Sequence, residues 1–330
     1  MNGMGDGNNR VFSFLGHWFT IAPVARHTLA PRRVSASVPF RLSVPDAKYG
    51  EVRLSGRLHH APSDTLLVVV HGLGGDVGSH YVLTAVGAAE AAGLASLRVN
   101  LRGSDRTGQD IYHAAITQDL HASLASADLA RYSRILLLGY SLGGHIVLRA
   151  ATEQALDPRV KAVAAVCPPL DLFIGARAID EPSRLMYRRH VLSAIKEIYA
   201  EVAARRPVPL PIAEARRIAT IRDWDQHIVA PRFGFRGADH YYGESSVAPR
   251  LGRIEVPSLV VAAEHDPMIP KETLLPILSG ARPPLEVRWI DRGGHVGFPA
   301  RVDLGFSGPS GLEDQVVAWL LDRAGVRAPA

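Results

Sequence analysis

One serine in the chain lies in a setting that favours nucleophilic chemistry. The segment Gly139-Tyr140-Ser141-Leu142-Gly143 fits the pattern G-x-S-x-G, and it lies between the apolar run Ile135–Leu138 and a helix-like segment. In such a strand-to-helix turn the hydroxyl is exposed, and small neighbours relieve crowding around strained backbone angles. We therefore predict that Ser141 is a nucleophile and that the amide of Leu142, at the helix start, stabilises an oxyanion.

A glycine-rich loop is the candidate for the second oxyanion donor. The run His71–Gly75 (HGLGG) follows the apolar segment Leu66–Val70. Because glycines flank Leu73, its backbone N–H can approach a substrate closely. A phosphate-binding loop is the competing interpretation. It is disfavoured, since no Lys followed by Ser or Thr is present and Val77 replaces the last glycine of the dinucleotide fingerprint.

A serine hydroxyl needs a general base to react well near neutral pH. Among 14 histidines, His295 is the best candidate, because it lies in the segment Gly293–Gly297 just after the last predicted strand. The rivals His71, His113 and His145 are better explained as structural or substrate-lining side chains. We predict His295 as the base.

The base in turn needs an acid that fixes its tautomer. Asp266 ends the apolar run Ser258–Ala263 and precedes Pro267, so it could also cap a turn there. The order Ser141, Asp266, His295 is the order found in one class of serine hydrolases. Asp171, which follows an earlier strand, is the second candidate for the acid.

Apolar strand-like runs alternate with helix-like segments along most of the chain. This alternation predicts a mostly parallel sheet with helices on both faces. The predicted strands are 66–70, 94–100, 135–138, 160–167, 258–263 and 285–290, and the predicted helices are 79–92, 111–130, 142–153 and 311–324.

The segment 173–250 differs, because it interrupts the alternation. It contains an amphipathic helix over 185–202 with apolar residues at three- and four-residue spacing, followed by the breaker 205–211. Insertions at this position commonly cover the sheet edge where ligands bind. We predict a helical cap, the alternative being a purely structural insertion. The chain then divides into an N-terminal arm (1–48), a first core part (49–172), the cap (173–250) and a second core part (251–330).

Composition limits the partners and cofactors. The chain has 330 residues, 47% hydrophobic and 21% charged, and a formal net charge of +5 without a Lys/Arg block. A nucleic-acid partner is therefore not expected. Cys167 is the single cysteine, which excludes an internal disulfide and a cysteine metal cluster. We expect no metal and no organic cofactor.

The N-terminal run Val11–Ala25 is apolar but is interrupted by His17 and Pro23 and is too short to span a bilayer. It also fits a secretion signal poorly. We expect an arm that packs on the body or lies on a membrane surface. The predicted location is cytoplasmic, with the arm as a candidate peripheral membrane contact.

Taken in order, these motifs resemble the YheT-like α/β hydrolases. The resemblance rests on HGLGG (71–75), NLRG (100–103), GYSLGGH (139–145), EHDPMIP (264–270) and GGHVGF (293–298), and it runs from about residue 49 to 324. It implies an α/β-hydrolase fold, a triad of Ser141, Asp266 and His295, and scaffold roles for Asn100 and Arg102. His145 departs from the family pattern, in which a smaller polar residue is expected.

The predicted activity is cleavage of a carboxylic ester through an acyl-enzyme, on a small ester or an acylglycerol-like lipid with a short or medium acyl chain. Two alternatives remain: an acyltransferase with the same triad, and a catalytically silent scaffold that binds a ligand. For Arg102 we prefer an ion pair with Asp119 over anion binding. The candidate substrate-lining residues are His71, His145, Phe235, Tyr241 and Tyr242, although aromatic residues in a cap are as often its own core.

Overall fold

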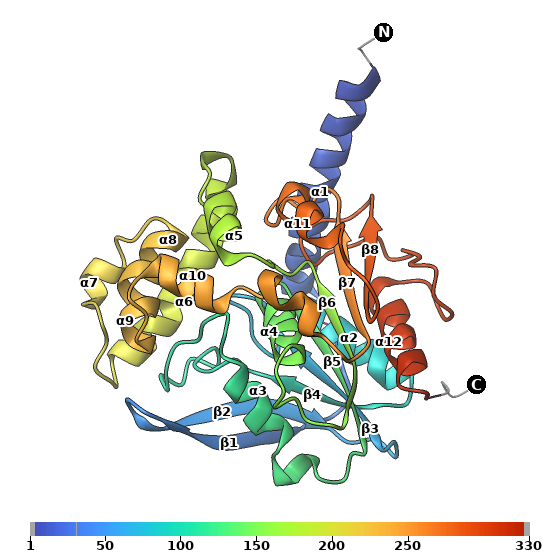
Figure 1. The fold of residues 1–330 in the computed structure, drawn as a ribbon, viewed down its shortest axis with the longest axis horizontal. Helices are drawn as coiled ribbons and strands as arrows, with labels where there is room; N and C mark the ends of the chain where they lie inside the picture. Colours follow the sequence, from blue (N-terminus) through green and yellow to red (C-terminus); the bar gives the residue numbers. More distant parts are fainter. Residues whose placement is uncertain (1–3, 31, 327–330) are drawn as a thin grey trace.

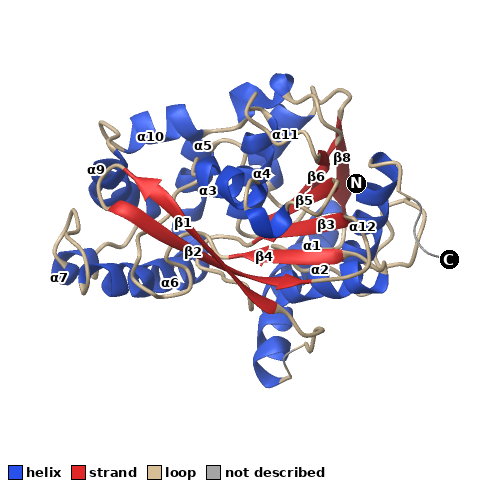
Figure 2. Cartoon of the chain, turned by 90° about the horizontal axis from the view of Figure 1, so that it is seen from below, coloured by secondary structure: helices blue, strands red, loops and turns tan. Residues whose placement is uncertain are grey.

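The computed structural model describes residues 4–30 and 32–326, with side chains from residue 14 onward. Its centre is an eight-stranded sheet in the order β1-β2-β4-β3-β5-β6-β7-β8 (Figures 1 and 2). The strands from β3 to β8 are parallel, whereas β1 and β2 form an antiparallel edge. Their bounds are β1 Val38–Asp46, β2 Gly50–His59, β3 Thr65–Val70, β4 Ala95–Val99, β5 Arg134–Tyr140, β6 Val160–Val166, β7 Ser258–Ala263 and β8 Leu285–Ile290.

Helices cover both faces of this sheet, which confirms the predicted fold class. Alternate residues of β3 enter two different cores, because successive side chains of a strand point to opposite faces. Val68 packs with residues of α3 (Thr117–Leu124) and α4 (Leu142–Ala151). Val69 packs with residues of α2 (His80–Ala91) and α12 (Leu312–Arg323). Burial on both faces explains why β3 reads as one apolar run.

The sheet begins earlier in the chain than predicted. Residues 38–46, assigned to the N-terminal arm, form β1 and pair with β2. In β1 only Phe40 and Val44 are buried, and Pro39 and Pro45 interrupt the strand pattern. Proline is tolerated on an edge strand, where some N–H groups have no partner. The strand was missed because its sequence carries these edge features.

The helix predicted over 111–130 is also shorter than expected. Regular helix is confined to α3 and the short turn η1 (Ala127–Leu129). The apolar residues Ile111, Tyr112 and Ala114 lie in a loop before α3, and they are buried in the core shared with cap residues. Their apolarity therefore reflects burial rather than a helical face.

Between β6 and β7 the described elements are all helical. They lie to one side of the sheet in Figure 1 and form the segment that we call the cap. The longest is α6, whose buried residues include Leu192, Ile195 and Tyr199 at the predicted spacing. The elements are α5 Leu172–Ile179, η2 Pro182–Arg184, α6 Leu185–Ala203, α7 Ile212–Ala215, α8 Ile221–Trp224, η3 Asp225–Val229, α9 Ala230–Phe233, α10 Ala238–Ser245 and η4 Ala248–Arg253. The helix α11 (Lys271–Leu278) follows β7.

The N-terminal arm contains a single helix, α1 (Met4–Leu29), with Pro23 inside it. Its first turns extend away from the body, and its last turns lie against it (Figure 1). No helix in the described part of the chain combines the length and the apolarity that crossing a membrane requires.

Candidate active site

Ser141 occupies a strained turn between β5 and α4. Its backbone angles are φ 51° and ψ −119°, a region that side-chain-bearing residues rarely adopt. The flanking glycines are sterically required. A Cβ on Gly139 would lie 2.2 Å from the Gly143 oxygen, and a Cβ on Gly143 would lie 2.3 Å from the Val70 oxygen. The G-x-S-x-G pattern thus follows from the close contact of β5, α4 and the end of β3.

Three side chains from distant parts of the chain meet above the carboxyl ends of the parallel strands. His295 Nε2 lies 2.9 Å from Ser141 Oγ, and His295 Nδ1 lies 2.9 Å from Asp266 Oδ2. Ser141 follows β5, Asp266 follows β7 and His295 follows β8. Both His295 and Asp266 are buried. This is the geometry of a serine nucleophile, its base and an orienting acid.

Asp266 is fixed by more than the histidine. Its second oxygen, Oδ1, accepts hydrogen bonds from the amides of Met268 at 2.8 Å and Ile269 at 2.9 Å. The carboxylate therefore also holds the turn after β7. The second candidate acid, Asp171, is the N-cap of α5 and accepts from the amide of Ile174. The structure thus brings Asp266, and not Asp171, to the imidazole.

The loop after β3 lies against Ser141, since a Cβ on Gly72 would lie 3.0 Å from the Ser141 Cβ. The amides of Gly72 and Gly74 donate to the hydroxyls of Tyr81 at 3.0 Å and Tyr112 at 2.6 Å. Among the described residues, no acceptor is found for the Leu73 N–H, and Leu73 lines the pocket. Leu142 is the first residue of α4, where N–H groups have no partner within the helix. Leu73 and Leu142, the two predicted donors, both line the pocket that contains Ser141.

His71 does not line the pocket, so its predicted substrate-lining role is wrong. The ring is fully buried, and Nδ1 donates to the Gly72 oxygen at 2.7 Å. Nε2 accepts from the Leu101 amide at 3.1 Å and faces the Ser104 hydroxyl. Burial lowers the pKa of His71 to about 4, so the ring stays neutral. His71 thus ties the loop after β3 to the loop after β4.

Two more predicted lining residues lie outside the pocket. His145 is buried, and its nitrogens face the carbonyl oxygens of Pro169 and Ser245, which ties α4 to the end of α10. Phe235 packs on His113 and Tyr241 within the aromatic core of the cap. Sequence alone could not distinguish an aromatic residue of the cap core from one at a cavity wall. Tyr241 and Tyr242 do line the pocket.

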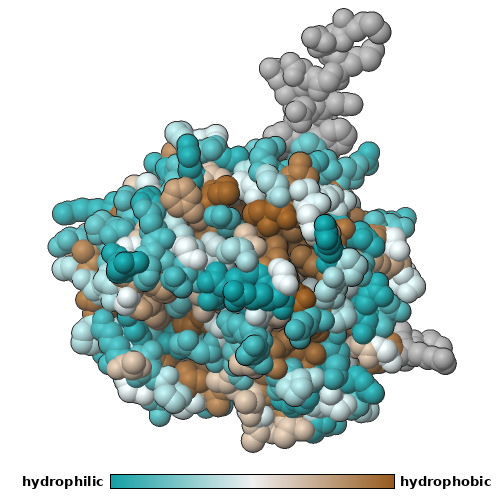
Figure 3. All heavy atoms as spheres, in the orientation of Figure 1, coloured by the Kyte–Doolittle hydropathy of each residue, from teal (hydrophilic) through white to brown (hydrophobic). Residues whose placement is uncertain are grey.

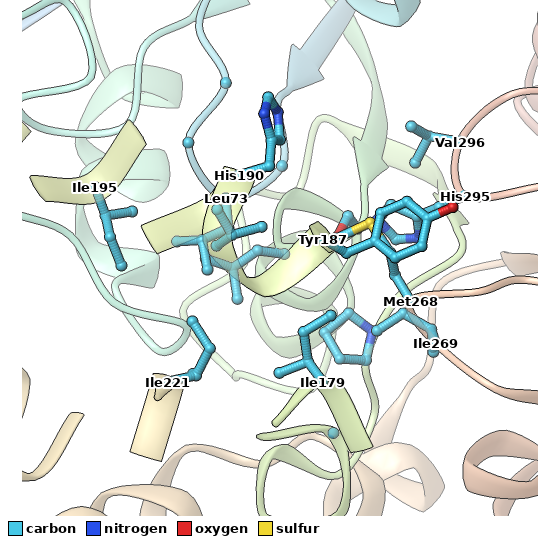
Figure 4. Close-up of a pocket in the computed structure, with 18 of the residues that line it drawn as sticks. Leu73, Ile179, Tyr187, His190, Ile195, Ile221, Met268, Ile269, His295 and Val296 are labelled. Carbon is cyan, nitrogen blue, oxygen red and sulfur yellow. The ribbon is translucent and has the colours of Figure 1, made fainter. Parts of the chain in front are cut away.

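The pocket that opens at Ser141 has a volume of about 550 Å³. Its wall is mainly aliphatic, and Figure 4 shows Leu73, Ile179, Ile195 and Ile221 on one side and His295 on the other. Such a size and lining are typical of sites for small ligands. On the outer surface, apolar side chains gather between α5 and α11 (Figure 3). The cavity therefore suits an apolar chain more than a highly charged ligand.

The cap contributes a buried carboxyl group to this pocket that the sequence analysis missed. Asp225 begins η3, lines the pocket and accepts a hydrogen bond from the Tyr242 hydroxyl at 2.7 Å. Burial raises the pKa of Asp225 to about 7, although the bond from Tyr242 opposes the shift. His113, a rival for the base, also lines the pocket, and burial lowers its pKa to about 3. The sequence marks Asp225 only as one of several acids in the cap.

A metal ion bound beside His295 would compete with an existing hydrogen bond. Potential ligand atoms of Cys167, Asp266 and His295 lie within 4.8 Å of one another. However, the imidazole Nδ1 and the carboxylate already bind each other, and burial raises the pKa of the Cys167 thiol well above its usual range. A metal ion at this point would have to displace the hydrogen bond between His295 and Asp266.

Arg102 forms the predicted ion pair. Its Nε lies 2.8 Å from Asp119 Oδ2, and its side chain is fully buried. The guanidinium also binds Asp46 and Asp110. Asn100 accepts from the Val77 amide and donates to the Ser55 hydroxyl, which fixes the loop after β4. Both side chains thus hold loops in place and do not line the pocket.

The sequence analysis did not predict that α1 forms part of the pocket wall and bonds to the segment that carries His295. Thr20 and Ile21 line the pocket, and the Thr20 hydroxyl bonds the backbone of His295. No local pattern could reveal this, because the partners are 275 positions apart.

Comparisons with known proteins agree with this architecture. The sequence model of the alpha/beta hydrolase family matches residues 67–303. The protein named "Putative esterase YheT" of Escherichia coli is 31% identical over 82% of this chain and 83% of its own length. The "Medium-chain fatty acid ethyl ester synthase/esterase 2" of Saccharomyces cerevisiae is 24% identical over 71% of this chain, which spans 58% of that relative.

Among solved structures, an esterase of Pyrococcus furiosus superposes with a TM-score of 0.52 at 16% identity. The match covers 81% of this chain and 90% of the esterase. At this identity the likeness concerns the fold alone.

Proposed function

The chain belongs to the α/β hydrolase family, and from this premise we propose that it hydrolyses carboxylic esters through a covalent acyl-enzyme. The observation that carries the proposal is the continuous chain of hydrogen bonds from Ser141 through His295 to Asp266. The esterase names of relatives agree with this chemistry.

The reaction follows from the positions of the groups. Ser141 Oγ attacks the ester carbonyl carbon while its proton passes to His295 Nε2. The carbonyl oxygen becomes an oxyanion that accepts hydrogen bonds from the amides of Leu73 and Leu142. His295 then returns the proton to the departing alcohol. In the second half of the reaction, the same nitrogen takes a proton from a water molecule, whose oxygen attacks the acyl carbon. The bond to Ser141 Oγ then breaks, His295 gives the proton to that oxygen, and the carboxylic acid leaves.

An active-site label tests the nucleophile directly. A fluorophosphonate probe should modify the wild-type protein once, on Ser141, and should not modify Ser141→Ala. The same variant should lose hydrolysis of p-nitrophenyl esters. Equal labelling of both proteins would show that the nucleophile lies elsewhere.

We propose further that the acyl chain is short to medium in length and lies in the aliphatic part of the pocket. The support is the volume of about 550 Å³ and the aliphatic wall formed by residues such as Ile195. The name of the yeast relative refers to medium-chain esters and is consistent with this assignment.

A chain-length series of p-nitrophenyl esters tests this assignment. Wild-type kcat/KM should peak at a short or medium chain, and Ile195→Trp, which fills the cavity, should move the maximum to shorter chains. A profile that Ile195→Trp leaves unchanged would place the acyl chain elsewhere.

We propose finally that α1 rests on a lipid surface. Phe14 and Trp18 lie one turn apart on α1 and are 68% and 58% exposed. Ile21 and Val24 continue the apolar surface into the pocket lining, and Arg26 adds positive charge in the last turn. Aromatic and basic side chains of this kind favour the membrane interface. An ester held in lipid would then face the pocket entrance.

A further inference from the structure

The helix α1 contacts both loops that carry the base and its acid. A Cβ on Gly16 would lie 2.1 Å from the carbonyl oxygen of His265, the residue before Asp266. A Cβ on Gly294 would lie 2.2 Å from the Gly16 oxygen, and one on Gly297 would lie 2.0 Å from the Phe19 oxygen. These glycines therefore allow backbone-to-backbone packing between α1 and the segments that flank the triad.

One side chain of α1 makes a directed bond to the catalytic loop. The Thr20 hydroxyl donates to the Gly16 oxygen at 2.8 Å and accepts from the His295 backbone N–H at 2.8 Å. Its single proton is thus directed into the helix, and an oxygen lone pair faces His295. Because both bonds are satisfied at once, the hydroxyl has one defined orientation.

The loop that Thr20 holds is strained. Val296, the next residue, has φ 53°, which is rare for a β-branched side chain. Gly294 and Gly297 close the turn with a 2.8 Å backbone hydrogen bond. A strained conformation persists only where its surroundings fix it. The bond from Thr20 supplies such a constraint at His295 itself.

The same helix also reaches the cap. His17 Nδ1 lies 2.6 Å from the Tyr187 hydroxyl of α6, and the two rings stack with centroids 5.7 Å apart. His17 and Thr20 are three positions apart and therefore lie on the same side of α1. One turn of this helix thus connects the catalytic loop to the cap.

We propose that Thr20 is a positioning residue of the hydrolytic site, whose hydroxyl holds the His295 loop so that Nε2 stays within reach of Ser141 Oγ. This rests on the proposed function of the triad. The family match begins at residue 67, so α1 lies outside the matched segment.

The test compares three variants of the full chain. Thr20→Val removes the acceptor and keeps the shape, whereas Thr20→Ser keeps the hydroxyl. Thr84→Val is the matched control. The Thr84 hydroxyl of α2 donates to the carbonyl oxygen four positions earlier, that of His80, as Thr20 does to Gly16. Thr84 itself does not line the pocket. For each protein we would measure kcat, KM, the rate of fluorophosphonate labelling and the melting temperature.

Thr20→Val should lower kcat and the labelling rate by about 10- to 100-fold, with KM and the melting temperature near the values of Thr84→Val. Thr20→Ser should restore both rates to within about threefold of wild type, because the hydrogen bond returns. Equal rates in Thr20→Val and Thr84→Val would overturn the proposal, as would a loss that serine does not restore. If wild type itself labels at Ser141 but cleaves no ester, the proposed function fails while the labelling comparison still tests Thr20.

Discussion

Arg232 of the cap binds Asp110 of the core through a buried ion pair, with 2.8 Å between Nε and Oδ1. The guanidinium also contacts Asp46 at 3.0 Å, and Arg102 forms ion pairs with the same two carboxylates. The α9 helix that carries Arg232 is thereby fixed to the edge strand β1 and to the loop before α3. The cap is held to the core by charge as well as by apolar packing.

Removing Arg232 should therefore destabilise the whole fold. Arg232→Met leaves two buried carboxylates with one fewer cation, and breaking such a pair costs about 3–5 kcal/mol. Urea unfolding should show a lower midpoint. Arg222→Met is the matched control, because its bond to Asp239 is exposed and should matter little. Equal midpoints for the two variants would contradict the structural role of Arg232.

Asp266→Asn should abolish most turnover without unfolding the protein. The amide would favour the wrong imidazole tautomer and could no longer stabilise a protonated His295. We expect kcat to fall by about 10⁴-fold, as for triad acids generally. Circular dichroism would check the fold. Near-normal kcat would move the acid to another residue, with Asp171 the first to test.

The buried carboxyl group of Asp225 predicts a pH-dependent stability. Its pKa is raised to about 7, so the folded state keeps a proton that the unfolded chain releases near pH 4. The stabilisation is thus complete below about pH 4 and is lost as pH rises through about 7, by at most about 4 kcal/mol.

Asp225→Asn should flatten this dependence, since the amide does not titrate and its oxygen can still accept from Tyr242. Glu313 is half-buried, and desolvation raises its pKa to about 7 as well. It provides the matched comparison because it lies in α12, away from the pocket. Melting temperatures of wild type, Asp225→Asn and Glu313→Gln between pH 4 and 8 test the assignment. A wild-type slope unchanged in Asp225→Asn would show that this carboxyl group is ionised in the folded state.

Substitutions on the exposed side of α1 test the lipid contact. Phe14→Ser combined with Trp18→Ser should reduce cosedimentation with phospholipid vesicles, and anionic vesicles should bind wild type better than neutral ones. Neither side chain lines the pocket, so turnover of a soluble ester reports that the fold is intact. Vesicle binding equal to wild type would exclude this surface as the contact.

Much of the fold could be predicted because buried parallel strands read as short apolar runs. The strands 258–263 and 285–290 were predicted to the residue, and the turn at Ser141 follows from its glycines. The edge strand β1 was missed because half of it faces solvent and two prolines interrupt it. Thr20 could not be found, since a hydroxyl in a helix carries no sign of a partner at the other end of the chain.

The contact between α1 and the loop after β8 also has a consequence for folding. Thr20 and His295 are 275 positions apart, so the bond between them closes a long stretch of chain. Contacts of such large sequence separation form only when the segments that lie between them have been brought together. The final shape of the His295 loop is therefore expected to be reached late in folding, and slow or incomplete docking of α1 would leave this loop unfixed.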